Sequence, residues 1–223
     1  MEKELIEYAN IRKEKMKEKI SLFLSSDDAA AVAQKAFAFH FGENPQSFQQ
    51  YYVQSIANRD NYLSSENFFR VFKQKYALQG IDNGFLGMLE KEKKVILQYI
   101  DNDDISTLYF DFFASAQIRH GDGIVSKNLG SFFAKLVHTF CPDKFCALDN
   151  PIKNYFGLGK ESFFMAFIIV SQAYQEWAKE NPVIMRKIRN EFENNSTAKP
   201  YSTKMTNLKL LDLIFWDHTN RTE

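Results

Sequence analysis

The residue with the clearest chemical potential is Asp149, in the run Ala147-Leu148-Asp149-Asn150-Pro151. Aspartate before Asn-Pro is typical of a helix N-cap followed by a proline in the first turn. A carboxylate in that place caps the helix, which is worth about 1 kcal/mol. It can also stabilise positive charge that develops in a reaction, or orient an attacking water. The residues alone leave both roles open.

A second candidate lies upstream, where the polar run K-N-L-G-S begins at Lys127. A turn followed by a helix start directs backbone N–H groups to one spot and suits a phosphate. Glycine allows the backbone to approach such a ligand closely. We therefore expect nucleic-acid contacts from Lys127, Asn128, Gly130, Ser131, Lys135 and Lys153, with Arg119 from a preceding loop.

The helix that positions these groups is predicted over residues 131–140. Its apolar residues recur at helical spacing and indicate one buried face. Pro142 ends it, and Asp143-Lys144 turns the chain. A hairpin over residues 125–149 therefore contains a buried helix and ends with Asp149 at the next helix start.

Residues 125–157 resemble the helix-hairpin-helix DNA glycosylase superfamily, and within it bacterial proteins with an 8-oxoguanine-glycosylase fold. The family hairpin has the form P-G-V-G-x-K-x-A, onto which K-N-L-G-S-F-F-A can be laid. Gly130 and Ala134 then take the places of the second glycine and the alanine. Asn128 replaces the first glycine, which is tolerable because asparagine also visits the left-handed region.

The resemblance implies an all-α fold with a helix-hairpin-helix core and a DNA-binding, base-excising activity. Asp149 matches the family aspartate that stabilises an oxocarbenium-like sugar or orients water. Phe132 occupies the position of the lysine nucleophile of bifunctional members, so a lyase based on that lysine is not expected. Two functions stay open: a monofunctional glycosylase, and a catalytically inactive interaction module of a prokaryotic stress or defence system. No cofactor is implied.

The charge balance weighs against a protein that coats nucleic acid. The chain of 223 residues has 28 basic and 28 acidic side chains and a formal net charge of zero. Non-specific DNA affinity comes from phosphate neutralisation. This balance therefore favours the inactive module, although it leaves room for a local basic face. The 22 phenylalanines predict an aromatic-packed core, with stacking platforms for bases as the alternative.

Cysteine usage and hydropathy predict a cytoplasmic protein. Two cysteines, Cys141 and Cys146, form no disulfide framework, and the charged N-terminus has no secretory pattern. The longest apolar run, over residues 163–170, is far shorter than a membrane span. His138, the two cysteines and Asp149 match no common zinc spacing, so no metal site is expected.

Two parts of the chain are expected. Residues 1–24 form a charged helix that packs on the body, with a homodimer through this helix as the alternative. Residues 25–223 form a single all-α domain. Its helices are predicted at 29–41, 45–57, 66–80, 85–100, 105–118, 131–140, 162–179 and 205–216, with others starting at Asn150 and Pro182. Loops are predicted at 119–123 and 194–203.

Overall fold

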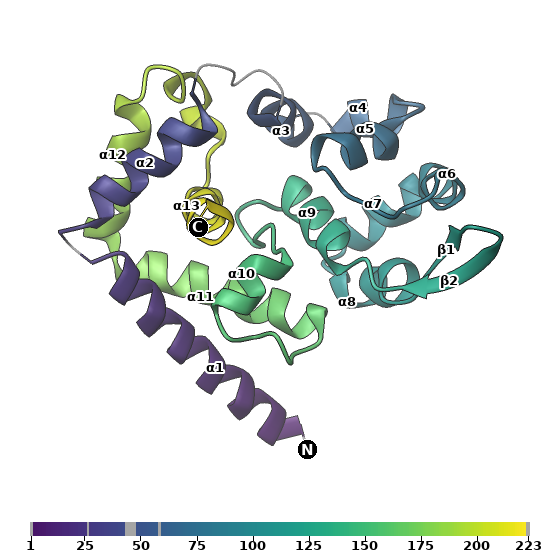
Figure 1. The fold of residues 1–223 in the computed structure, drawn as a ribbon, viewed down its shortest axis with the longest axis horizontal. Coiled ribbons are helices and arrows are strands. Elements are labelled where there is room, and N and C mark those ends of the chain that lie inside the picture. Colours follow the sequence, from purple (N-terminus) through teal and green to yellow (C-terminus); the bar gives the residue numbers. More distant parts are fainter. Residues whose placement is uncertain (1, 26, 43–47, 58, 222–223) are drawn as a thin grey trace. The chain divides into compact units, whose positions relative to one another are not determined.

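The computed structural model describes residues 2–25, 27–42, 48–57 and 59–221. Over these ranges the chain is mostly helical, as predicted, with one two-stranded antiparallel sheet (Figure 1). The chain divides into two compact units: unit 1 contains residues 1–45 and 142–223, and unit 2 contains residues 46–141. The chain thus leaves unit 1 after Pro45 and returns to it after Cys141. The predicted division at residue 25 stays a prediction.

Unit 1 is built from helices at both ends of the sequence. Its elements are α1 (Glu2–Phe23), α2 (Ala29–His40), α10 (Asn150–Tyr155), α11 (Phe163–Glu180), α12 (Pro182–Asn194), the 3-10 helix η2 (Lys199–Lys204) and α13 (Asn207–Arg221). The long apolar helix α11 buries ten side chains, among them Phe167 and Trp177. Unit 1 therefore has its own hydrophobic core, with α11 at its centre.

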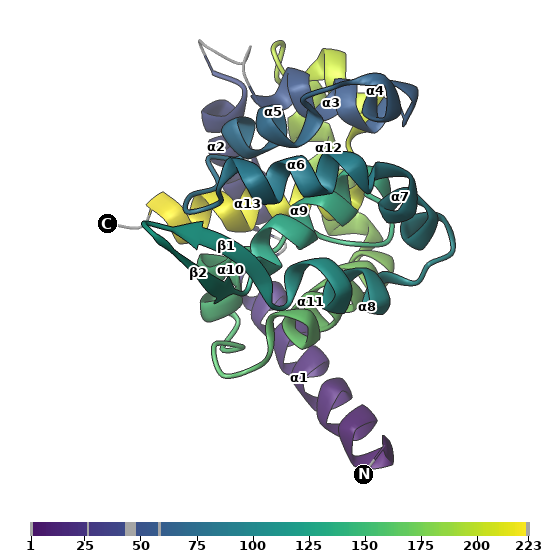
Figure 2. The same cartoon turned by 90° about the vertical axis from the view of Figure 1, so that its right-hand side faces the viewer.

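The charged helix α1 packs against α11 (Figure 2). Met16, Ile20 and Leu24 are buried along its inner side. The ammonium groups of Lys13 and Lys17 beside this seam each lie 2.7 Å from a glutamate oxygen of α11. Lysines thus flank an apolar seam and meet acidic partners, which holds α1 on unit 1.

Unit 2 comprises the middle of the chain. Its elements are α3 (Phe48–Ala57), α4 (Arg59–Ser64), α5 (Phe68–Lys75), α6 (Asn83–Lys91), α7 (Lys93–Asp101), α8 (Ile105–Leu108), the π-helix η1 (Tyr109–Phe113), β1 (Ala116–His120), β2 (Gly123–Lys127) and α9 (Gly130–Phe140). Phe132 lies inside it, 1% exposed, with its ring 5.1 Å from that of Phe72 and 5.6 Å from that of Phe113. The expected aromatic packing is present in this unit.

The helix predicted over 105–118 and the loop predicted over 119–123 are wrong. The helix ends with η1, and the chain then forms the hairpin β1–β2. Ala116 and Ile118 are buried while Gln117 and Arg119 are exposed, a period of two that suits a half-buried strand. Gly121 in the turn has φ +59°, a conformation that favours glycine. The element directly before α9 is consequently a strand of one short hairpin, in a chain that is otherwise mostly helical.

Other boundaries differ more modestly. The single helix predicted over 85–100 is two helices, α6 and α7, which meet at Glu92. The 3-10 helix η2 lies within the loop predicted over 194–203. The predicted start at Pro45 falls outside the described residues, and α3 begins at Phe48. Of the helices described, none has the length and apolar character that crossing a membrane requires.

Candidate functional site

Asp149 is the N-cap of α10, as predicted. Its backbone is extended, with φ −129° and ψ 175°, and its side chain accepts a hydrogen bond of 3.2 Å from the backbone N–H of Ile152. Pro151 occupies the first turn, where its missing N–H costs nothing. The residue is 8% exposed. The carboxylate is therefore held in a fixed position with little contact with water.

Buried polar groups from α11 and from the loop before α10 accompany this carboxylate. The hydroxyl of Ser171 accepts from the backbone N–H of Cys146 at 3.0 Å and donates to its thiol at 3.4 Å. The pKa of Cys146 is raised to about 12, mainly by burial and to a smaller extent by the charges of Asp212 and Asp149, while the Ser171 hydrogen bond opposes the rise. Burial likewise raises the pKa of Tyr174, with contributions from Cys146, Asp212 and Asp149. These groups are close enough to act on one another.

Helix α13 adds a buried ion pair to the same region. The Lys209 ammonium lies 2.8 Å from a carboxylate oxygen of Asp212, and the two side chains are 3% and 6% exposed. We define the Asp149 cluster as Cys146, Asp149, Ser171, Tyr174, Lys209 and Asp212. Two members of this cluster, Cys146 and Tyr174, have raised pKa values, and buried ionisable groups gathered in one place are typical of functional sites.

Sequence reasoning found Asp149 but missed Ser171, Tyr174, Lys209 and Asp212. One signal was present: Lys209 and Asp212 stand one turn apart in the otherwise apolar run L-K-L-L-D-L-I-F. Charges at that spacing within an apolar helix face indicate a buried pair. Ser171 and Tyr174 gave no comparable signal, because isolated serines and tyrosines are common on helices.

Tyr174→Phe tests whether the buried hydroxyl of Tyr174 lowers the stability of the protein. The Tyr174 hydroxyl is buried and has no hydrogen-bond partner among the described residues. A buried hydroxyl without a partner costs about 1–3 kcal/mol. We expect the free energy of unfolding in urea to stay constant or to rise by about 1 kcal/mol in this variant. A fall of that size would show that the hydroxyl contributes a bond that matters.

His40 makes the stability of unit 1 depend on pH. Its Nε2 hydrogen-bonds the carbonyl oxygen of Leu213 at 3.0 Å. Burial, and next the charge of Lys209, lower the His40 pKa to about 4. Because the unfolded chain takes up this proton more readily, stability is complete above about pH 6.5 and falls as the pH drops toward 4. Urea titrations across this window should show a smaller fall for His40→Gln.

The hairpin amides that were expected to hold a phosphate are used inside unit 2. The backbone N–H of Leu129 donates to the carbonyl of Phe113 at 2.8 Å, and that of Gly130 donates to the Asn128 side chain at 2.9 Å. The Asn128 amide also donates to the Tyr109 hydroxyl at 2.6 Å. The notch expected at this helix start is therefore closed at residues 129 and 130, because the strand before α9 bonds to η1.

The lysines expected at a nucleic-acid backbone also have partners inside the protein. Lys127 donates to the carbonyls of Gln79 and Gly80 at 3.3 and 3.2 Å, and Lys135 donates to the Ser131 hydroxyl at 2.9 Å. Lys153 is buried, and its ammonium lies 3.2 and 2.7 Å from the carbonyls of residues 159 and 161. These contacts tie each ammonium to its own unit.

Arg119 differs, because its side chain is exposed on β1. It belongs to unit 2 with Lys127, Asn128, Gly130, Ser131 and Lys135, whereas Asp149 and Lys153 belong to unit 1. The structure thus divides the predicted residues between the two units. In unit 1, Asp149 lies among buried ionisable groups. In unit 2, the hairpin carries the exposed Arg119.

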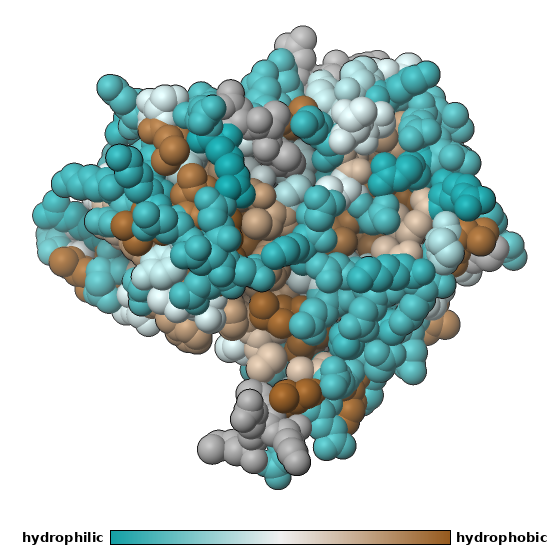
Figure 3. All heavy atoms as spheres, turned by 180° about the vertical axis from the view of Figure 1, so that it is seen from behind, coloured by the Kyte–Doolittle hydropathy of each residue, from teal (hydrophilic) through white to brown (hydrophobic). Residues whose placement is uncertain are grey.

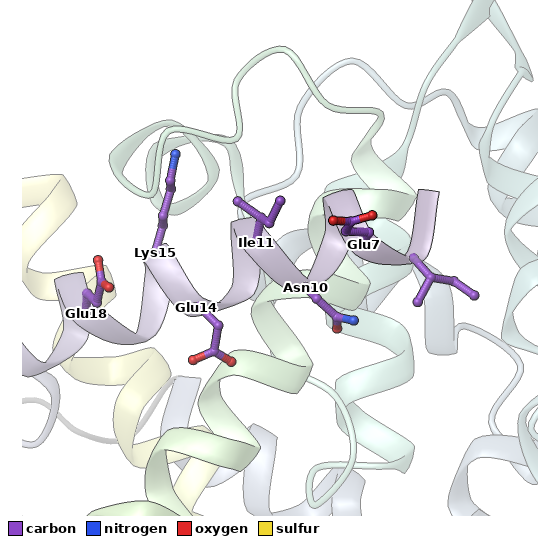
Figure 4. Close-up of a pocket in the computed structure, with 7 residues that line it drawn as sticks. Glu7, Asn10, Ile11, Glu14, Lys15 and Glu18 are labelled. Atoms are coloured by element: carbon purple, nitrogen blue, oxygen red, sulfur yellow. The ribbon is translucent and has the colours of Figure 1, made fainter. Parts of the chain in front are cut away.

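A shallow hollow lies along α1, and Figure 4 shows the side chains that line it. Its lining residues all come from this one helix, and Glu7, Glu14 and Glu18 dominate them. On the face drawn in Figure 3, hydrophobic residues occur in small groups separated by hydrophilic ones. The hollow has no second element to enclose a ligand, and we assign it no chemistry.

Among the described residues, no three histidine, cysteine or acidic side chains gather in a way that could hold a metal ion. His138 instead bonds Tyr52 at 2.8 Å inside unit 2, and Cys146 bonds Ser171 in unit 1. No protein-family model, no curated protein and no solved structure matches this chain. The argument for function therefore depends on the site itself.

Proposed function

We propose that the protein binds DNA and removes a damaged or modified base, as a monofunctional DNA glycosylase does, with Asp149 as its catalytic residue. The observation that carries this proposal is the position of the carboxylate. It is fixed at the start of α10 and nearly buried beside other ionisable groups. A charge in such surroundings interacts more strongly with a developing opposite charge than one in water does.

In the proposed reaction, the bond between the sugar C1′ and the base nitrogen breaks, and its electron pair leaves with the base. Positive charge develops on the sugar, where the Asp149 carboxylate stabilises it. A water molecule then adds to C1′ and passes a proton to the carboxylate, and solvent protonates the departing base. The target base must first leave the stack. The product is an abasic site in an intact strand.

Phe132 supports a reaction without strand cleavage. It stands where the resemblance places a lysine nucleophile, and its ring is packed in the core of unit 2. A phenylalanine has no amine to form a Schiff base. Strand breaks should therefore appear only after alkali treatment.

Base release is the direct test. Labelled duplexes with single oxidised, alkylated or deaminated bases would be incubated with the protein and split into samples with and without alkali. The proposal expects alkali-dependent breaks at one class of lesion. Breaks without alkali would contradict the monofunctional reaction, and a complete absence of breaks would contradict catalysis.

Salt dependence tests DNA binding separately. The chain has no net charge, and Lys127, Lys135 and Lys153 bond to other groups of the protein. We expect few phosphate contacts, about one to three, so log K should fall against log[salt] with a slope of about −1 to −3. Fluorescence anisotropy between roughly 50 and 200 mM salt measures this slope. A flat response would contradict phosphate contacts.

The second candidate is a catalytically inactive interaction module, and the occupied hairpin amides favour it. A homodimer through α1 would have to use the outer side of that helix, because its inner side packs on α11. That outer side carries Glu7, Glu14 and Glu18 together with Lys15, and Ile6 and Ile11 are exposed beside them. Sedimentation equilibrium shows whether the protein is a homodimer. If it is a monomer and releases no base, the remaining candidate is an inactive module that binds a different partner.

A further inference from the structure

The hairpin β1–β2 presents one exposed face of mixed chemistry. The strands pair in register, with Gln117 opposite Ser126 and Arg119 opposite Ile124. Cross-strand partners point to the same side of a sheet, so these four residues share one face. All four are exposed, and Ile124 is 73% exposed. We call this surface, made of Gln117, Arg119, Ile124 and Ser126, the ribbon face.

The opposite side of the hairpin holds it in place. Ala116 and Ile118 are buried there, and β1 packs against α6. The side chain of Asp82, the N-cap of α6, accepts a hydrogen bond of 2.7 Å from the backbone N–H of Arg119. Lys127 ties the end of β2 to the carbonyls of Gln79 and Gly80. The ribbon face is thus a fixed surface, and the hairpin extends from the helices of unit 2 in Figures 1 and 2.

The composition of the ribbon face matches the chemistry of base edges in duplex DNA. Arginine donates two hydrogen bonds to guanine O6 and N7, and glutamine pairs with adenine N6 and N7. Serine bonds to either kind of edge, and an aliphatic side chain contacts the thymine methyl group. A two-stranded ribbon has the width that the major groove admits. Arg119 is the one charged residue of the ribbon face, because Lys127, opposite Ala116, belongs to the other face and bonds to Gln79 and Gly80.

We propose that the ribbon face enters the major groove of duplex DNA and reads base edges, with Arg119 as its main contact. This inference rests on the proposed DNA binding but not on the reaction at Asp149. It assigns the exposed aliphatic Ile124 a role, because an isolated apolar side chain beside two polar readers suits a thymine methyl group. The predicted phosphate contact of Arg119 is thereby replaced by a base contact.

Three single variants and a pool of duplexes with a randomised central segment test the proposal. The wild-type protein is first used to select bound duplexes, and the affinity for the selected and the random pool is measured by anisotropy. Arg119→Ala should weaken binding to the selected duplex about 5- to 150-fold and relax the preference at one base position. Gln117→Ala should relax a neighbouring position. Arg70→Ala, which removes an exposed cation of α5, should change neither.

The outcomes separate the two proposals. If the wild-type protein binds no duplex, DNA binding itself is overturned, and this inference with it. If the protein binds DNA but Arg119→Ala weakens all sequences equally and lowers the salt slope by about one, Arg119 contacts phosphate and the base-reading proposal is overturned. Equal affinity of Arg119→Ala and wild type overturns it as well. Circular dichroism melts confirm that each variant is folded, which is expected because the altered side chains are exposed.

Discussion

Replacing Asp149 with asparagine is expected to slow the proposed base release about 10²- to 10³-fold while leaving the fold in place. Asparagine and aspartate are about equally good N-caps, so the hydrogen bond from the Ile152 N–H is retained. The negative charge is lost, and with it the interaction with positive charge on the sugar. The loss of one preorganised electrostatic contact costs about 10²- to 10³-fold in rate. Single-turnover release of the lesion base measures this loss.

Two further variants separate charge from capping. Asp149→Ala removes both, so it should lose activity and about 1 kcal/mol of unfolding free energy. Ser162→Ala removes an N-cap of the same unit, where the Ser162 hydroxyl accepts from the Met165 N–H at 3.2 Å. It should cost a similar stability and leave the rate unchanged. If Asp149→Asn releases base as fast as the wild type, Asp149 is a cap and nothing more.

The sequence allowed the features that depend on local spacing to be predicted. The run D-N-P placed Asp149 at a helix start, and α10 begins there. The apolar spacing around Phe132 predicted a buried helix face, and α9 buries it. Both features follow from residues within one or two turns of each other, where cap chemistry and helical period act directly.

Features that depend on distant partners were not predictable in this way. The backbone N–H of Leu129 donates to the carbonyl of Phe113, which belongs to η1. The strands β1 and β2 lie between these two residues, where a helix end and a loop were expected. The Asp149 cluster collects residues from α11, α13 and the loop that ends at the N-cap of α10. Nothing in the spacing of Asp149, Tyr174 and Asp212 along the chain indicates that these groups lie near one another. Only the packing of the helices brings them together.

We expect a substitution that breaks the buried ion pair between Lys209 and Asp212 to destabilise unit 1 strongly. Both side chains are almost fully buried. Lys209→Met removes the positive partner and leaves the Asp212 carboxylate buried without it. Breaking a buried pair in this way costs about 3–5 kcal/mol, because the remaining charge has neither water nor a counter-ion. Urea unfolding should show this loss.

The double variant Lys209→Met, Asp212→Asn should recover part of the loss, since it removes both charges at similar volume. Arg59→Met is the matched control. Arg59 pairs with Asp101 on the surface of unit 2, with both side chains 45% exposed, and such pairs contribute less than about 1 kcal/mol. Lys209→Met also removes a charge that lowers the pKa of His40, so that pKa should move up toward its ordinary value, as NMR titration of the ring would show. A loss below about 1 kcal/mol with an unchanged His40 pKa would mean that water reaches the pair, and that the surroundings of Asp149 are more polar than the proposed reaction requires.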